Sequence, residues 1–98
     1  RFRPPLGDSL MIERTVRIVN KNGLHARPAA EIVKLAAKFH AEITITKDDL
    51  DVNGKSIMGV MMLAAEHGSD ITFRAEGPDA QQALDALATL VSNKFGES

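Results

Sequence analysis

TVRIVNKNGLHARPAAEIVKLAAKF, residues 15–39, changes its hydrophobic period part-way along. As far as Asn20, apolar and polar residues alternate, which predicts a β-strand with Val16 and Ile18 on its apolar face. Turn-forming residues follow. Residues 26–39 then carry apolar side chains at helical spacing, with charged residues on the opposite side. The stretch therefore encodes a strand, a turn and a helix in direct succession.

Three further strands are predicted from alternating apolar and polar residues, at 42–46, 50–53 and 71–76. Between the last two, Ser56 is a good N-cap for a short helix through about Ala65, which Gly68 stops. Asp79 is placed to cap a final helix, with Gln82 in the capping-box position. The apolar stripe of that helix consists of Ala83, Leu84, Leu87 and Val91.

The element order is therefore βαββαβα. Strands with one apolar face need a helical layer on that face and can leave the other face wet. We expect an α+β fold, a two-layer open-faced β-sandwich in which a four-stranded, mostly antiparallel sheet carries three helices on one face. The chain has 98 residues, enough for one domain. Residues 1–10 lack periodicity and include paired prolines, so we interpret them as an N-terminal appendage, a tag or tail, and residues 11–98 as the domain.

Composition excludes several classes of function. The chain has no cysteine, so it has no disulfide or thiolate metal site, and its three histidines form no close pair. Its net charge is −1 and it lacks Trp and Tyr, which argues against nucleic-acid binding. No apolar run reaches membrane-spanning length and no signal-peptide pattern is present. We expect a cytoplasmic protein without a metal or membrane insertion.

The turn before the first helix carries the chemistry. Pro28 fits the first helical turn, which places His25 near the N-cap. The exposed amides and positive dipole end of a helix favour an anion there, and Arg27 adds a guanidinium suited to phosphate oxygens. Because histidine can form covalent intermediates, we interpret His25 as a phosphoryl acceptor. The plainer alternative is a histidine that only caps the helix.

Ser56 also has two interpretations. It is an N-cap whose contribution to stability is about 1 kcal/mol, or it is a regulatory phosphorylation site, since phosphoserine is tolerated at a helix N-terminus. The apolar run that follows it cannot all face one core from one short helix. Some of these side chains should be exposed, and exposed methionines suit adaptable binding surfaces. That most of them are simply core is the alternative.

Two segments resemble those of the HPr family, the histidine-containing phosphocarriers of the bacterial sugar phosphotransferase system. Residues 23–29, GLHARPA, resemble the family's active-site motif, and residues 54–61, GKSIMGVM, resemble its regulatory segment. The spacing between the motifs also matches, and βαββαβα is the order of the HPr fold. The resemblance covers Met11 to about Gly96, whereas residues 1–10 depart from the family pattern.

The resemblance implies a phosphoryl carrier that is not itself an enzyme and needs no cofactor. His25 would be phosphorylated at a ring nitrogen, and Arg27 would support the phosphoryl group. Enzyme I, charged from phosphoenolpyruvate, would be the donor and an enzyme IIA domain the usual acceptor. HPr kinase/phosphorylase would modify Ser56. The carrier is expected to be a monomer.

The resemblance also implies a partner-binding patch beside the active site, whereas Val60 and Leu63 would belong to the core. The patch residues are Ala26, Ile57, Met58 and Met61. Two alternatives to the sugar-uptake carrier remain. One is the nitrogen-related regulatory paralogue, which would also use His25, and the other is a regulator that only docks and is controlled by Ser56.

Overall fold

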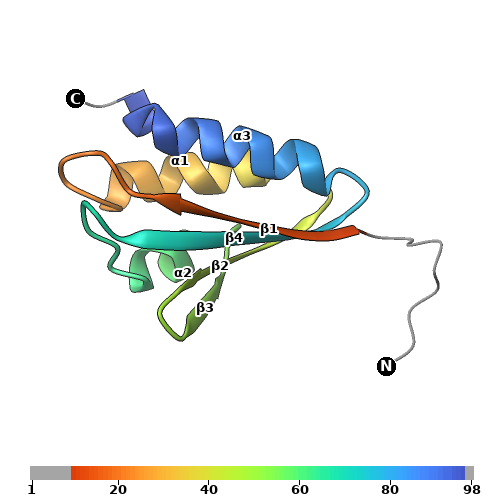
Figure 1. Cartoon of the computed structure of the whole chain (residues 1–98), viewed down its shortest axis with the longest axis horizontal. Helices are drawn as coiled ribbons and strands as arrows, with labels where there is room; N and C mark the ends of the chain where they lie inside the picture. The colour runs from red at the N-terminus through yellow and green to blue at the C-terminus, as the bar shows by residue number, and fades with distance from the viewer. Residues whose placement is uncertain (1–9, 97–98) are drawn as a thin grey trace.

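The computed structural model describes residues 10–96, which form four strands and three helices followed by a single 3-10 turn. Figure 1 shows their arrangement. In chain order they are β1 (Leu10–Arg17), α1 (Ala26–Ala36), β2 (Glu42–Lys47), β3 (Leu50–Asn53), α2 (Ile57–Met62), β4 (Asp70–Gly77), α3 (Ala80–Ser92) and η1 (Lys94–Gly96). The predicted βαββαβα order is confirmed.

The four strands form one sheet in the order β1-β4-β2-β3, and each neighbouring pair is antiparallel. β1 begins at Leu10, which pairs with Gly77, so the paired strand starts one residue before the boundary predicted at Met11. The rest of the predicted appendage, residues 1–9, lies outside the described residues.

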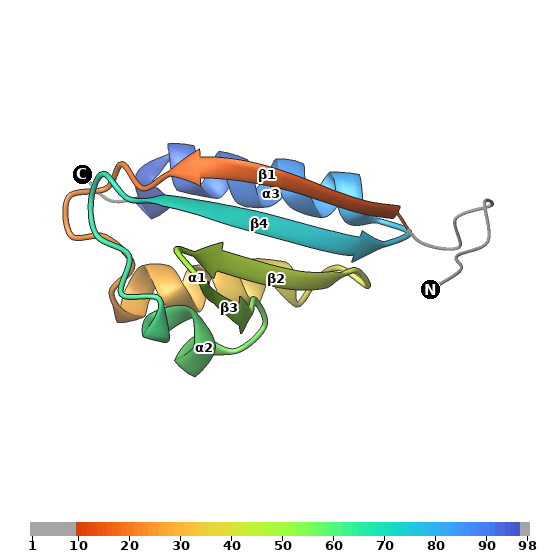
Figure 2. The ribbon, with the colours of Figure 1, turned by 60° about the horizontal axis from the view of Figure 1, so that its bottom comes forward.

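The two long helices, α1 and α3, lie together on one face of the sheet, and α2 contacts α1 and β3 (Figure 1). Figure 2 shows the strands in front of α1 and α3. The uncovered face is polar: Thr15 and Thr72 are hydrogen-bonded at 2.8 Å, and Arg74 lies 3.7 Å from Glu13 and 3.6 Å from Asp51. The open-faced sandwich is therefore confirmed.

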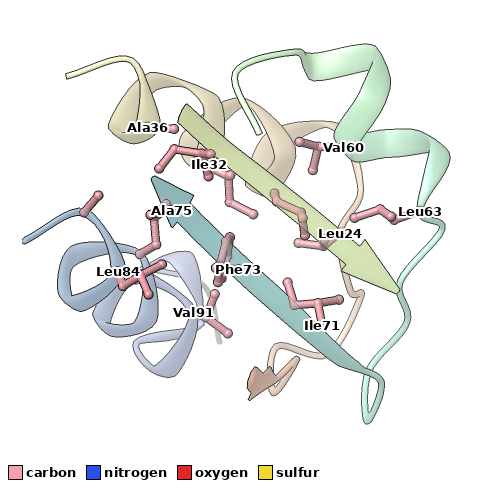
Figure 3. Close-up of a cluster of buried hydrophobic side chains, with 14 of the residues drawn as sticks. Leu24, Ile32, Ala36, Val60, Leu63, Ile71, Phe73, Ala75, Leu84 and Val91 are labelled. Carbon is pink, nitrogen blue, oxygen red and sulfur yellow. The ribbon is translucent and has the colours of Figure 1, made fainter. Parts of the chain in front are cut away.

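The core lies between the sheet and the helices (Figure 3). Along β4, alternate residues are buried, and the side chain of Phe73 is fully enclosed. Ile32 of α1 and Leu84 of α3 enter the same cluster, as their helical spacing predicts. Within residues 10–96 no helix has the length and apolar character needed to cross a bilayer.

Helices α1 and α2 are shorter than predicted, and each ends where the backbone leaves helical geometry. α1 ends at Ala36 and not Phe39, because the next N–H groups, of Lys38 and Phe39, bond three residues back in a turn. α2 ends at Met62 and not Ala65, since Ala64 has a φ of +49°. No stop signal in the sequence marks either position.

The capping box predicted for α3 is wrong. The Asp79 carboxylate makes no cap hydrogen bond. It accepts hydrogen bonds from the backbone N–H groups of His40 and Ala41, both at 2.8 Å. These partners lie 39 and 38 residues earlier in the chain, so local spacing could not predict them. The carboxylate joins the end of the α1–β2 connection to the start of α3.

Candidate functional site

His25 is the N-cap residue of α1, with extended backbone angles of φ −76° and ψ −173°, and it is exposed. Its side chain makes no cap hydrogen bond with the helix. The plain capping role is therefore excluded, and the ring is accessible from solvent at a helix start. That position is the one the sequence predicted.

Two other parts of the chain, Asn20 and the segment at Ala65, hold the backbone before His25 in place. Gly23 has a φ of +70°, and a β-carbon there would lie 2.5 Å from the Ala65 carbonyl oxygen. The Leu24 N–H donates to that same oxygen at 2.8 Å. The amide of buried Asn20 donates to the Gly23 carbonyl at 2.8 Å. Glycine is required at this close approach, which fixes the entry into α1.

The Leu24 side chain is buried and lies in the same cluster as Val60 and Leu63 (Figure 3). It anchors the residue directly before His25 in the core. The His25 loop therefore has the core on one side and solvent on the other. Small rotations of the loop would require Leu24 to leave a packed environment, which is unfavourable.

The first turn of α1 offers a suitable environment for an anion. The first intrahelical hydrogen bond runs from the Ala29 N–H to the His25 carbonyl at 3.0 Å, so the amides of Ala26 and Arg27 have no intrahelical acceptor. Pro28 is buried and has no N–H, as expected within a first turn. Ala26 and Arg27 are exposed. An anion held near His25 would meet backbone N–H groups, the positive end of the helix dipole and a guanidinium.

Ser56 caps α2 as predicted: its Oγ accepts a hydrogen bond from the Gly59 N–H at 3.0 Å. Ser56 itself is half-buried. A hydroxyl can accept this bond and still donate its proton elsewhere. Capping and modification are therefore compatible on geometric grounds.

The apolar residues of α2 divide between core and solvent. Val60 and Leu63 are buried, as the sequence analysis expected. Four large side chains remain exposed, by the following fractions: Ile57 45 %, Met58 74 %, Met61 42 % and Met62 64 %. Met62 belongs to the apolar run of which some members were expected to be exposed, but the expected patch did not include it, although its spacing of four residues from Met58 places both on one side of the helix.

The His25 loop and the segment after α2 lie side by side. The Leu24–Ala65 hydrogen bond joins them, and Figure 2 shows the two stretches running together at one end of the sheet. Helices α1 and α2 also contact one another. The exposed imidazole and the exposed apolar helix thus belong to one end of the molecule. Within residues 10–96, no cluster of three or more His, Asp or Glu could hold a metal ion.

Comparison with known proteins decides the family. The family model described as "PTS HPr component phosphorylation site" matches residues 12–93. The chain belongs to the HPr family. This membership supports a phosphocarrier role in the phosphotransferase system (PTS).

Several relatives of this chain are known by sequence. A phosphocarrier protein HPr of Cupriavidus necator is 48 % identical over 87 residues, which covers 89 % of this chain and 98 % of the relative. A phosphocarrier protein NPr of Shewanella violacea is 45 % identical over 89 % of this chain and 96 % of its own length. An HPr-like protein Crh of Halalkalibacterium halodurans is 48 % identical over 86 % of this chain and all of its own.

The fold is shared with solved HPr structures. HPr from Thermoanaerobacter tengcongensis superposes with a TM-score of 0.85, at 48 % identity, over 89 % of this chain and 98 % of that chain. An HPr dimer from the same organism superposes with a TM-score of 0.72, at 49 % identity, over 84 % of this chain and 94 % of that chain.

Proposed function

We propose that this protein carries a phosphoryl group on a ring nitrogen of His25, taking it from enzyme I and passing it to an enzyme IIA domain during PTS sugar uptake. The observation that carries the proposal is the exposed His25 ring at the start of α1, two residues before the exposed Arg27. Membership of the HPr family supports the same role.

The transfer needs little covalent chemistry from the carrier. The lone pair of an unprotonated His25 nitrogen attacks the phosphorus, a nitrogen–phosphorus bond forms, and the bond from phosphorus to the donor atom of enzyme I breaks, leaving its electron pair on the donor. The α1 amides and Arg27 stabilise the charge on the three phosphoryl oxygens. Phosphoryl transfer depends mainly on position and charge, so an exposed site suffices once a partner has docked. Transfer to the acceptor is the same step in the opposite sense, and the carrier acts as a substrate of other proteins and not as an enzyme.

The patch on α2 provides the docking surface. Ile57, Met58 and Met61 expose apolar area beside the His25 loop, and Ala26 adds a small exposed residue at the helix start. Phosphorylation of Ser56 by HPr kinase/phosphorylase would place two negative charges at the edge of this surface and reduce binding of partners with acidic docking residues.

The decisive experiment incubates the protein with phosphoenolpyruvate and enzyme I and maps the acid-labile phosphate. Label should appear on His25, and His25→Ala should abolish it. His67→Ala is the matched control, because His67 is also exposed but lies outside the α1 turn. Label on another residue, or on none with several enzymes I, contradicts the proposal.

The partners require separate tests. An NPr relative at 45 % identity favours, as second candidate, a nitrogen-related relay that also uses His25. Transfer from phosphorylated protein to a sugar-specific enzyme IIA or to a nitrogen-related one separates the two. A Crh relative makes docking alone the third candidate, which full biological output from His25→Ala would support. We also propose a cytoplasmic monomer; since a related HPr forms a dimer, sedimentation equilibrium is the test.

A further inference from the structure

Methionine is concentrated on one short helix of this protein. The chain has four methionines, and three of them, Met58, Met61 and Met62, lie on α2. All three are exposed, and Met58 is the most exposed large apolar side chain among the described residues. The fourth, Met11, is 60 % exposed on β1. It therefore supplies a control of similar accessibility outside α2.

The spacing of the three residues puts their sulfurs on the solvent side of α2. Met58 and Met62 are four residues apart, and Met58 and Met61 are three apart, so they are neighbours on the helix surface. Val60 and Leu63 hold the other side in the core. Because the exposed methionines contribute little to that core, chemical change at their sulfurs leaves the anchoring contacts in place.

We propose that Met58, Met61 and Met62 form an oxidation site through which peroxide weakens docking of the phosphoryl donor and acceptor. The inference rests on the proposed function, because it treats exposed α2 as the docking surface. A methionine sulfoxide is polar and chiral where the thioether was apolar and adaptable, so an apolar partner surface would have to bury an unsatisfied S=O group.

The oxidation step balances with hydrogen peroxide as the oxidant. A lone pair on the methionine Sδ attacks one peroxide oxygen, a sulfur–oxygen bond forms and the oxygen–oxygen bond breaks. The departing hydroxide takes the proton from the oxygen that is now bound to sulfur, which gives water and the sulfoxide. Sulfur is oxidised by two electrons and the peroxide is reduced. Methionine sulfoxide reductases reverse the change at the expense of a thiol reductant.

The test treats the full chain with hydrogen peroxide, locates added oxygen by peptide mass spectrometry, and measures the rate of phosphorylation by enzyme I and phosphoenolpyruvate. We expect oxygen on the α2 methionines and a rise of about tenfold in the KM for the carrier, the size expected when one buried apolar side chain is lost from an interface. The kcat should change much less, since the His25 turn is untouched. Reductase treatment should restore the original KM.

Two variants make the assignment specific. Met11→Leu should still show the rise in KM after peroxide. In Met58→Leu/Met61→Leu/Met62→Leu, the KM before and after peroxide should be equal, whatever its starting value. An unchanged KM in fully oxidised protein, or an equal rise in the triple variant, overturns the inference. The thermal melting temperature of the oxidised protein should match that of the untreated protein. A large loss of stability would mean that unfolding, and not weaker docking, raises the KM, and it would also overturn the inference. Absence of label on His25 before any peroxide would instead contradict the proposed function.

Discussion

Gly23 is the residue on which the geometry of the His25 loop most depends. Its φ of +70° suits glycine, and its α-carbon lies so close to the chain after α2 that a β-carbon would be 2.9 Å from the Glu66 α-carbon as well as 2.5 Å from the Ala65 oxygen. Gly23→Ala therefore combines backbone strain with a clash against backbone. We expect a loss of about 2–5 kcal/mol in the free energy of unfolding, measured with urea.

Gly68 provides the matched control. Its φ is +90°, yet nothing lies within 4 Å of the position where a β-carbon would be. Gly68→Ala should therefore show strain alone, a loss of about 1–2 kcal/mol. Phosphorylation by enzyme I should slow in Gly23→Ala, because Leu24 loses its hydrogen bond to Ala65, and remain unchanged in Gly68→Ala. Equal losses of stability in the two variants would contradict the role given to the close approach.

At the scale of elements, α2 is too short to be stable without its cap and its buried side chain, Val60. Ser56→Ala removes the hydrogen bond from the Gly59 N–H to Oγ, and we expect it to lower the free energy of unfolding by about 1 kcal/mol. Ser56→Asp keeps an acceptor at the N-cap, so its stability in urea should stay near that of the unmodified protein. If Ser56→Asp is as unstable as Ser56→Ala, the cap does not act through an acceptor oxygen.

Asp79 links two connections, and its effect depends on pH. The hydrogen bond from the His40 N–H, with a further one from Ala41, lowers the pKa of Asp79 below its ordinary value of 3.8. The unfolded chain then takes up the proton first, so the stability that the carboxylate contributes is present above about pH 5 and is lost as the pH falls through 3.8 to the lower folded pKa.

Asp79→Asn should therefore be less stable than the unmodified protein at neutral pH, and the difference should shrink as the pH is lowered. Asparagine offers one acceptor oxygen where the carboxylate offers two. Urea unfolding of both proteins between neutral pH and about pH 3 measures this difference. Asp70→Asn is the control, because it makes the same change to a carboxylate elsewhere: Asp70 pairs with Arg17 at the exposed end of β1. A constant difference across the range would contradict the lowered pKa.

Whether a feature could be predicted from the sequence depends on how far apart its interacting residues lie in the chain. Alternation and helical spacing predicted the order of the strands and of the two long helices, because they reflect which face meets the core. The first strand, predicted as far as Asn20, ends at Arg17. Ser56 could be predicted as a cap because its partner is three residues away. The partners of Asp79 could not be predicted, because they are distant in the chain. The final turn was also missed: Lys94 and Phe95 have positive φ without glycine, held by burial of the Phe95 ring.

The position of His25 at a helix start could be predicted because the residues that fix it lie in one local motif. The sequence GLHARPA places His25 at a helix start, since proline and glycine constrain the backbone on either side. What no local pattern contains is the contact of this loop with the chain after α2, made by the Leu24–Ala65 hydrogen bond. The proximity of the α2 surface to His25 entered the sequence analysis only through the resemblance to HPr.

Across the whole molecule, the exposed surface of the site lies away from the middle of the sheet. Leu24 and Val60 reach into the core cluster, but the His25 loop and α2 lie at one end of the molecule (Figures 1 and 2), whereas Phe73 lies on β4 in the middle of the core. Stability and transfer should therefore respond separately to substitution in the middle of the sheet. Phe73 is the test position, since it is fully buried on β4 and has no place in the exposed surface near His25.

Phe73→Leu removes part of a fully enclosed ring, and we expect it to lower the free energy of unfolding by about 1–2 kcal/mol through lost burial and a small cavity. The neighbouring variant Thr72→Ala, on the open face, removes only an exposed hydrogen bond to Thr15 and should change stability by less than about 0.5 kcal/mol. In both, phosphorylation of the folded protein by enzyme I should stay within about twofold of the original rate, because a domain of ordinary stability remains almost fully folded after such a loss. A large fall in the rate for Phe73→Leu, at a temperature where circular dichroism shows it folded, would mean that packing in the middle of the sheet controls the His25 loop directly.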